Sequence, residues 1–290
     1  MKNIVECPVC NGTSFNKFLE TKDYFLTKEK FNIVTCKTCD FHFTNPIPNE
    51  EHIGDYYKSE NYVSHNANKK GIINFLYNWV RKRTLRDKAM LVRHETEGKD
   101  LLDFGSGSGH FLSVAENYGF NGVGIEPSKE ARDFAIHTKG VKSSEPSVFY
   151  DFPKHSFDVI TLWHVLEHVM DLEKDIQQMH QILKFDGKLI VAVPNMNSFD
   201  ARHYKKYWAA YDLPRHLYHF QEKDIARLML KYNFQLKKVI PMKYDAYYIS
   251  MLSEKYRSRL MPFGIFIGLL SNLKAKKYGY SSQIYVFEKS

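Results

Sequence analysis

The sequence predicts an α/β protein in which an open, doubly wound parallel sheet follows a small cysteine-rich ribbon. From residue 99 onward, strand-like and helix-like segments alternate, which is the pattern of βαβ units with helices on both faces of a sheet. A glycine-rich loop, "DFGSGSG" (103–109), directly follows the first strand of this region. All four cysteines lie within the first 40 residues. These observations place the ribbon first and the sheet second.

The cysteines form two C-x2-C pairs, Cys7 with Cys10 and Cys36 with Cys39, which are separated by 25 residues. Each pair offers two sulfurs from one tight turn, and two such turns complete a tetrahedral four-thiolate zinc site. A disulfide pair or a thioredoxin-like redox motif fits this arrangement less well. We therefore predict that residues 1–48 form a zinc ribbon, in which a structural zinc ion supplies folding energy.

Residues 49–96 are predicted to connect the ribbon to the main domain. After a polar, turn-rich part, apolar residues recur at helical spacing; they are Ile72, Phe75, Leu76, Trp79 and Val80. Eight Lys or Arg accompany a single Asp between Lys69 and Arg93. We expect this helix to pack on the next domain with its basic face in solvent, and partner binding through that face is the alternative.

The alternating region supplies each element of the sheet in turn. Short apolar runs predict buried strands, Ser128 opens a helix, and Gly119 ends one. The predicted strands cover 100–105, 120–127, 157–165, 187–195, 235–240 and 282–290. The predicted helices cover 110–119, 128–140, 171–184, 221–234 and 245–260.

The glycine loop predicts a bound ligand at the carboxyl end of the first strand, where open parallel sheets bind ligands. Glycines at 105, 107 and 109 let the chain turn sharply and let its backbone approach a ligand. Residue 110 is histidine, so the G-x-G-x-x-G dinucleotide pattern is not met, and no Gly-Lys-Ser/Thr follows for a P-loop. Glu126 lies 21 residues after Gly105, at the end of the second strand, where a carboxylate accepts hydrogen bonds from ribose hydroxyls. Together these features indicate an adenosine ligand without a diphosphate, which we interpret as S-adenosyl-L-methionine.

Four segments, "LLDFGSGSGHFL", "GVGIEPS", "FDVITLWHVLEHVMD" and "GKLIVAVPN", resemble the successive motifs of class I S-adenosylmethionine-dependent methyltransferases. The resemblance covers residues 98–240. It implies a Rossmann-like, doubly wound, seven-stranded sheet with a reversed final hairpin, within a domain over 97–290. The implied cofactor-binding residues are Asp103, Gly105, Ser106, Gly107, Gly109, Glu126, Ser144 (or Glu145, beside the adenine amine) and Trp163.

Within this superfamily, "LEHV" and "DLPRHLYHF" are similar to ubiquinone O-methyltransferases and to zinc-ribbon enzymes that methylate sugars. The candidate catalytic residues are His164, His168 and His216, with Glu167 and His219 as further candidate bases, because histidine titrates near neutrality. We expect His164 and His168 to share one helix face beside Glu167. This cluster is read as a general base, as a structural or gating cluster, or as a divalent metal site, as in relatives with Glu at position 164. The histidine at that position favours zinc or iron over magnesium.

The segment 196–222 is expected to form a substrate lid, in which Trp208, Tyr211, Arg215 and His216 provide aromatic walls and an anion contact. No signature of amino methylation on DNA bases follows "DVITL", so oxygen or carbon is the expected acceptor. We predict methyl transfer to a small molecule, namely a sugar, a quinone or a lipid-like precursor. The alternatives are an RNA methyltransferase that uses the ribbon and the basic helix, and a non-catalytic scaffold.

The net charge is +8, and no acid occurs from Lys255 to Phe287. The apolar run "MPFGIFIGLL" within this stretch is flanked by Lys and Arg, so it is read either as buried or as a peripheral contact with anionic lipid. No signal peptide and no span of about 18 apolar residues is recognised, and a cytoplasmic protein is expected.

Overall fold

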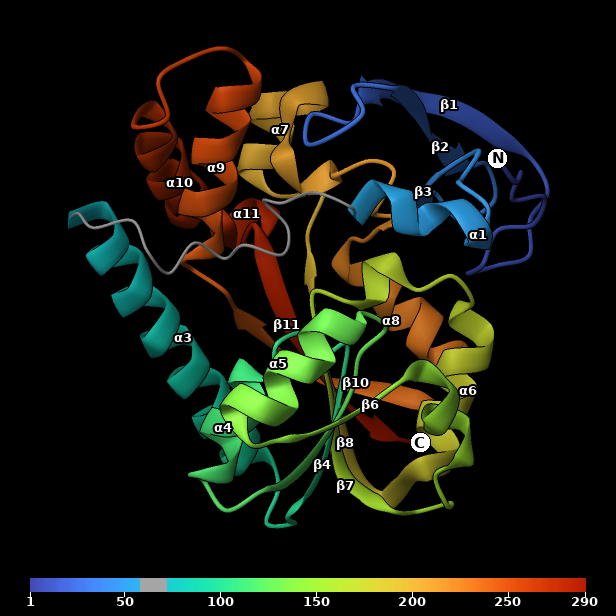
Figure 1. Cartoon of the computed structure of the whole chain (residues 1–290). Helices are drawn as coiled ribbons and strands as arrows, with labels where there is room; N and C mark the ends of the chain where they lie inside the picture. Colours follow the sequence, from blue (N-terminus) through green and yellow to red (C-terminus); the bar gives the residue numbers. More distant parts are fainter. Residues whose placement is uncertain (58–71) are drawn as a thin grey trace.

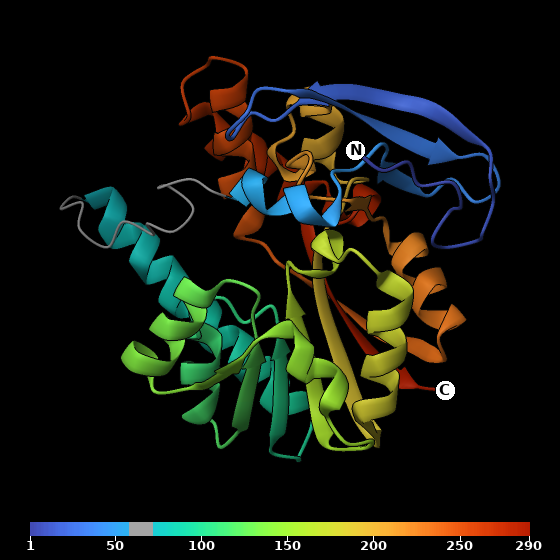
Figure 2. The same cartoon turned by 45° about the vertical axis from the view of Figure 1, so that its right-hand side comes forward.

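The computed structural model describes residues 1–57 and 72–290, with side chains from residue 78 onward in the second range (Figures 1 and 2). A seven-stranded sheet has the order β10-β11-β8-β7-β4-β5-β6. Strands β6, β5, β4, β7 and β8 are parallel, and β11 is antiparallel to both β8 and β10. Their bounds are β4 (Asp100–Phe104), β5 (Asn121–Ile125), β6 (Lys142–Ser144), β7 (Phe157–Trp163), β8 (Leu183–Pro194), β10 (Phe234–Pro241) and β11 (Ser282–Lys289). The predicted Rossmann-like sheet with a reversed final hairpin is confirmed.

Helices cover both faces of this sheet, as Figure 1 shows. One face packs against α3 (Ile72–Glu95), α4 (His110–Glu116) and α5 (Lys129–Lys139), through a cluster that includes Leu101 and Val159. The other face packs against α6 (Leu172–Ile182) and α8 (Glu222–Lys231), through Leu102 and Ile160. Because both faces are buried, the central strands are nearly continuous apolar runs.

Local signals in the sequence set several helix ends. The Ser128 hydroxyl accepts a hydrogen bond from the Ala131 amide (3.2 Å) and caps α5, as predicted. The helix predicted over 171–184 ends at Ile182, because the chain enters β8 at Leu183, four residues before the predicted start of that strand. The helix predicted over 245–260 is α9 (Asp245–Tyr256), and it is followed by α10 (Phe263–Leu273) and α11 (Ala275–Tyr278).

A second, four-stranded sheet has the order β1-β2-β3-β9 and lies at one end of the main sheet (Figure 2). Strands β1 (Phe15–Lys22), β2 (Lys30–Cys36) and β3 (His42–Thr44) come from the predicted ribbon. Strand β9 (Tyr218–His219) comes from the predicted lid and pairs antiparallel with β3. Ribbon and lid therefore share one sheet, although 173 residues lie between the end of β3 and the start of β9.

Short elements complete the end of the molecule that carries this second sheet. The lid contains α7 (Phe199–Tyr204), η4 (Lys205–Tyr207) and η5 (Ala209–Tyr211). The connector begins with α1 (Glu50–Ile53) and η1 (Gly54–Tyr57), and the main domain adds η2 (Pro146–Asp151) and η3 (Leu166–His168). None of the helices within residues 1–57 and 72–290 is both long and apolar enough to cross a bilayer.

Helix α3 packs on the domain through its C-terminal half, where Ala89 and Val92 are buried. This matches the expectation of a helix that packs against the next domain. Trp79 is half exposed (52%), so it does not continue the buried face. The side chains of Ile72, Phe75 and Leu76 lie outside those that the structure describes.

Candidate functional site

The glycine loop between β4 and α4 has the conformation that its sequence requires. Gly105, Gly107 and Gly109 all have positive φ (76°, 53° and 70°), a region that glycine occupies without steric cost. A Cβ at Gly105 would collide with the Val165 side chain, which ties the loop to the segment after β7. A Cβ at Gly107 would meet nothing within 4 Å. The backbone at Gly107 therefore faces open space and is accessible to a ligand.

Glu126, which follows β5, is held against this loop. Its Oε2 accepts a hydrogen bond from the Gly107 amide (2.9 Å), and its Oε1 accepts one from the Ser128 amide (2.8 Å). Burial raises the pKa of Glu126, and the two amide hydrogen bonds oppose this shift. A carboxylate has about four acceptor positions. Two amides thus leave capacity for two further donors, and the ribose hydroxyls that the sequence analysis expects remain a prediction.

Asp103, at the end of β4, is a buried carboxyl group beneath the loop. The Thr161 hydroxyl donates to its Oδ1 at 2.6 Å. Burial raises the pKa of Asp103 to about 7, while the Thr161 hydrogen bond and the nearby Lys88 lower it. A group with such a perturbed pKa beside a ligand loop is typical of a functional site.

Lys88 on α3 is a residue of this site that the sequence analysis missed. Its ammonium lies 4.5 Å from the centre of the Trp163 ring, and it interacts electrostatically with Asp245 and Asp103. Burial lowers the pKa of Lys88. The spacing along the helix could have identified it. Lys88 follows Leu85 by three residues and precedes Val92 by four, so it lies on the buried face of α3.

The other predicted cofactor residues take different positions. The Ser144 carbonyl, at the end of β6, accepts a hydrogen bond from the Glu126 amide (3.0 Å), which places the backbone of Ser144 next to that of Glu126. The Ser106 hydroxyl lies against Gly124 of β5, and it has no hydrogen-bond partner among the described residues. Trp163 packs edge-on against Phe111 (5.2 Å between ring centres) and below Lys88.

His164 follows β7 and joins two acidic side chains. Its Nε2 lies 3.0 Å from Asp245 Oδ2, and its Nδ1 lies 3.4 Å from Glu167 Oε1. Burial would lower the pKa of His164, but the contacts with Asp245 and Glu167 raise it to about 9. The imidazole is therefore protonated at neutral pH, where it holds Asp245 and Glu167 rather than accepting a proton.

The prediction that His164 and His168 share the face of one helix is wrong. His164 has a left-handed backbone (φ 59°), and only the 3-10 turn η3 follows it. The structure instead brings His168 together with Glu167 and with His216 from the lid, so that one ligand atom of each lies within 4.8 Å of the others.

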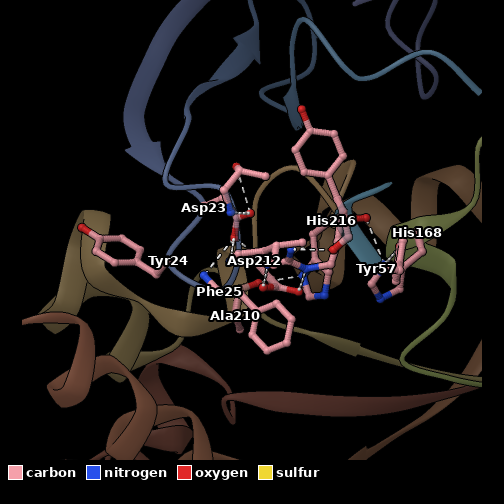
Figure 3. A network of polar contacts seen from close by, with 12 residues as sticks. Asp23, Tyr24, Phe25, Tyr57, His168, Ala210, Asp212 and His216 are labelled. Carbon is pink, nitrogen blue, oxygen red and sulfur yellow. Dashed lines mark hydrogen bonds and ion pairs between the residues drawn. The ribbon is translucent and has the colours of Figure 1, made fainter. Parts of the chain in front are cut away.

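The two histidines of this cluster each use Nδ1 to hydrogen-bond a backbone carbonyl. His168 Nδ1 donates to the Arg215 carbonyl (2.9 Å), and the Tyr57 hydroxyl lies 2.9 Å from that nitrogen (Figure 3). His216 Nδ1 donates to the Ala210 carbonyl (2.8 Å). Since a carbonyl only accepts, each Nδ1 carries a hydrogen and each Nε2 keeps a lone pair. Burial lowers the pKa of His168 to about 4, so its ring is neutral at pH 7. Such lone pairs accept a proton or bind a metal ion.

His219 belongs to the contact between ribbon and lid, not to this cluster. Its Nε2 lies 3.1 Å from the Thr44 hydroxyl, and Thr44 also donates to the His216 carbonyl (2.8 Å). Burial holds the pKa of His219 well below its usual range. Its place between β3 and β9 indicates a structural role, whereas the sequence left it as a candidate base.

The predicted walls and anion contact of the lid are also corrected. Trp208 and Tyr211 are buried in the lid core, and Trp208 Nε1 donates to Asp200 Oδ2 (2.7 Å). Arg215 directs its guanidinium to Asp212 (2.6 Å) and Asp23 (3.0 Å), the two aspartates labelled in Figure 3. These side chains stabilise the lid and its contact with the ribbon. Sequence patterns did not distinguish them from ligand-binding residues because both kinds are aromatic or charged.

The four cysteines meet as predicted. Cys7 Sγ lies 3.6 Å from Cys39 Sγ, and Cys10 Sγ lies 3.6 Å from Cys36 Sγ. All four sulfurs lie within 4.8 Å of one another. Zinc–sulfur bonds of about 2.3 Å place the sulfurs of a regular tetrahedron about 3.8 Å apart. The donor set and its spacing therefore fit a four-thiolate metal site.

Both cysteine turns close in the same way. Asn11 and Asp40, each directly after the second cysteine of its pair, have left-handed backbones (φ 61° and 62°). Their amides donate to the carbonyls of Cys7 and Cys36 (2.8 and 2.9 Å). Asn and Asp tolerate this conformation better than most residues, so these turns follow from the local sequence.

Comparison with known proteins agrees with this geometry. Residues 78–239, more than half of the chain, match the family model described as a methyltransferase domain. A segment of 102 residues is 32% identical to the ubiquinone biosynthesis O-methyltransferase of Pelagibacter ubique, covering 33% of this chain and 42% of that protein. A segment of 98 residues is 29% identical to the uncharacterized methyltransferase YcgJ of Bacillus subtilis, covering 31% of this chain and 39% of that protein. The chain thus spans less than half the length of either relative.

Two solved structures share the fold. An S-adenosylmethionine-dependent methyltransferase from Thermotoga maritima superposes with a TM-score of 0.51 at 20% identity, covering 74% of this chain and 97% of that one. Another, from Archaeoglobus fulgidus, gives a TM-score of 0.51 at 15% identity, covering 72% of this chain and 94% of that one.

Proposed function

This chain belongs to the methyltransferase domain family, as its sequence predicted, and on that premise we propose that it transfers a methyl group from S-adenosylmethionine to an oxygen of a small molecule. The observation that carries the proposal is the pairing of two features at the carboxyl end of the parallel strands. One is the open glycine loop with Glu126. The other is the Glu167–His168–His216 cluster, in which His168 is neutral at pH 7 and which follows Val165, the residue whose side chain lies against Gly105 of that loop.

The residues around the loop suit the parts of the cofactor, which when bound supplies a methyl group already activated on a sulfonium. Glu126 would accept hydrogen bonds from the ribose hydroxyls. Once Asp103 is ionised, it and Lys88 carry opposite charges, and the two groups influence each other electrostatically beneath the loop. They match the ammonium and the carboxylate of a methionine group, and this pairing would orient it.

An oxygen acceptor is favoured because the cluster offers a proton acceptor. A hydroxyl must lose its proton as it attacks the methyl group, and a neutral imidazole in reach serves as general base. His168 is neutral at pH 7, whereas His164 is protonated and would position Glu167. The partial similarity to ubiquinone O-methyltransferases supports the same type of acceptor.

A small acceptor is favoured over RNA because the cluster lies under a closed cover. Glu167 is completely buried, and the lid above it is tied to the ribbon by a buried ion pair and by the β3–β9 pairing. RNA binding that weakens steeply with salt would point to the alternative acceptor.

The four cysteines would bind a structural zinc ion, because a closed set of four thiolates leaves no position for a substrate. Its role would be to fold the ribbon on which the lid strand β9 pairs.

Metabolite mass spectrometry tests the proposed function. Extracts from cells with and without the protein are incubated with S-adenosylmethionine and purified protein, and a product heavier by one CH2 unit is sought. A Gly107→Arg variant should form no product, since its side chain occupies the open space above the loop. A Gly54→Arg variant is the matched control, because Gly54 has an ordinary helical backbone and open surroundings. The enzyme assignment is wrong if neither the unmodified protein nor the Gly54→Arg control yields a methylated product, and if isothermal titration detects no heat when the cofactor is added.

A further inference from the structure

Helices α9 and α10 form an antiparallel pair beside the lid (Figure 1). The packed face of α10 consists of small residues, because Gly264, Gly268 and Ser271 are buried. A Cβ at Gly264 would overlap the Met251 backbone, and one at Gly268 would lie 2.8 Å from Tyr247 Cα. These glycines therefore allow close approach of the two helices, and they fix which side of α10 faces inward.

The large apolar side chains of this hairpin consequently face solvent. Seven of them within 14 residues are each between 43% and 71% exposed; they are Leu260, Met261, Phe263, Ile265, Phe266, Leu269 and Leu273. Burial of this run, one of the two readings of its sequence, is thus excluded for these side chains. Soluble proteins seldom expose a large apolar patch unless the patch binds something.

Basic residues flank the patch on both sides. Lys255 and Arg259 are exposed before it, and Lys274, Lys276 and Lys277 are exposed after it. No acid occurs between Glu254 and Glu288. Glu254 itself is buried, where it accepts a hydrogen bond from the Tyr204 hydroxyl (3.0 Å). The exposed surface of the hairpin end is therefore apolar in the centre and positive at the rim.

We propose that this surface docks the protein on an anionic lipid bilayer, with α10 lying in the plane of the membrane. Apolar side chains would enter the boundary between headgroups and acyl chains, while the Lys and Arg rim contacts anionic headgroups. An 11-residue helix is about 16 Å long, which is too short to cross a bilayer of about 30 Å.

Charge distinguishes this occupant from a second copy of the chain. A two-fold contact places the same patch on both subunits, so the two basic rims would face each other and repel. An anionic bilayer instead offers complementary charge along the whole rim. The charge complementarity thus selects the lipid surface.

The same hairpin reaches the candidate active site, since Asp245, the first residue of α9, contacts His164. Docking would therefore place the Glu167–His168–His216 cluster near the bilayer. If the proposed function holds, this arrangement suits an acceptor that is itself membrane-bound, such as a lipid-like precursor with a hydroxyl group.

Vesicle sedimentation tests the docking without requiring methyl transfer, so failure of either proposal can be distinguished from failure of the other. The full-length protein is mixed with phosphatidylcholine vesicles, or with vesicles that also contain phosphatidylglycerol. We expect at least about tenfold stronger binding to the anionic vesicles, weakening as salt increases. Equal binding to both, or no binding, would overturn the proposal.

Two variants identify the surface responsible. Phe263→Asp combined with Phe266→Asp should abolish vesicle binding, whereas Phe185→Asp combined with Leu230→Asp should leave it unchanged. The side chains of the control pair are at least as exposed, but they lie on β8 and α8. Unchanged cofactor affinity verifies that each variant is folded. Light scattering on the same proteins completes the test, because a dimer that Phe263→Asp with Phe266→Asp dissociates would identify a second copy as the occupant and overturn the proposal.

Discussion

Arg215 of the lid donates to Asp23 of the ribbon at 3.0 Å, and both side chains are almost completely buried (2% and 0% exposed). Asp23 also accepts hydrogen bonds from the amides of Phe25, Leu26 and Thr27, so the turn after β1 is organised around this carboxylate. Burial opposes ionisation of Asp23, but Arg215 and the Thr27 amide hold its pKa below its usual range. The pair therefore fixes the lid to the ribbon.

Asp23→Asn should lower the free energy of unfolding by about 3–5 kcal/mol, because Arg215 would keep its charge in a buried site without its full set of partners. Urea denaturation followed by circular dichroism measures this change. Lys17→Gln is the matched control, since the Lys17–Glu20 pair is exposed to solvent and should contribute little to stability. Equal effects of the two substitutions would contradict a structural role for the buried pair.

Lys88→Met should weaken binding of S-adenosylmethionine about tenfold, which is about 1.4 kcal/mol, because the carboxylate of the methionine group loses its cationic partner. Isothermal titration measures the affinity. Lys82→Met, an exposed position on the same helix, should have no effect. If both variants bind like the unmodified protein, Lys88 does not contact the cofactor.

Cofactor affinity should rise with pH through the titration of Asp103. Its pKa is about 7, so the group is mostly protonated at pH 6 and mostly ionised at pH 8. If only the carboxylate holds the cofactor's ammonium group, the dissociation constant should fall about tenfold across this range. In an Asp103→Asn variant the cofactor affinity should be lower and should change little with pH. A steep pH dependence in that variant would assign the titration to another group.

The same titration of Asp103 should make the free protein less stable as the pH rises, whereas it strengthens cofactor binding. Folding raises the pKa of Asp103 above its ordinary value of 3.8. Its contribution to the free energy of unfolding is therefore present below about pH 3.8, and it is lost as the pH rises through about 7. Bound cofactor, which favours the ionised form, should reduce this loss.

His168→Gln should lower the rate of methyl transfer at least about 100-fold while cofactor affinity stays unchanged, because the general base is lost and the glycine loop is not. Steady-state kinetics and isothermal titration separate the two effects. His155→Gln is the control, since this histidine stacks on the exposed Phe185, away from the cluster. A rate that falls for both variants would argue against a specific role for His168.

Removal of the metal should affect the acceptor side more than the cofactor side. A Cys36→Ser variant should lose bound zinc, and the β3–β9 pairing should weaken because the ribbon depends on the metal for its folding. The glycine loop belongs to the other sheet, so cofactor affinity should persist. Elemental analysis and titration measure the two properties. Full turnover in metal-free protein would show that the ribbon does not support the lid.

Patterns local to the chain determined the main sheet, the glycine loop and the cysteine site. Apolar runs mark β4, β7 and β8 because both faces of those strands are buried. The glycines were recognisable because their backbone conformations exclude other residues, and Glu126 because it ends the next strand. Two C-x2-C turns specify a four-thiolate site whatever lies between them.

Only the tertiary structure decided the roles of the remaining charged and aromatic residues. The sequence around Arg215 does not distinguish an arginine that binds an anion from one that pairs with Asp23, which is 192 residues away. Likewise, His164 is a candidate base until α9 brings Asp245 to it across 81 residues, and the apolar run of α10 is ambiguous until Gly264 and Gly268 choose its buried face. The physical reason is that ionisation and burial depend on neighbours in space. Those neighbours come from segments whose separation along the chain carries no periodic signal.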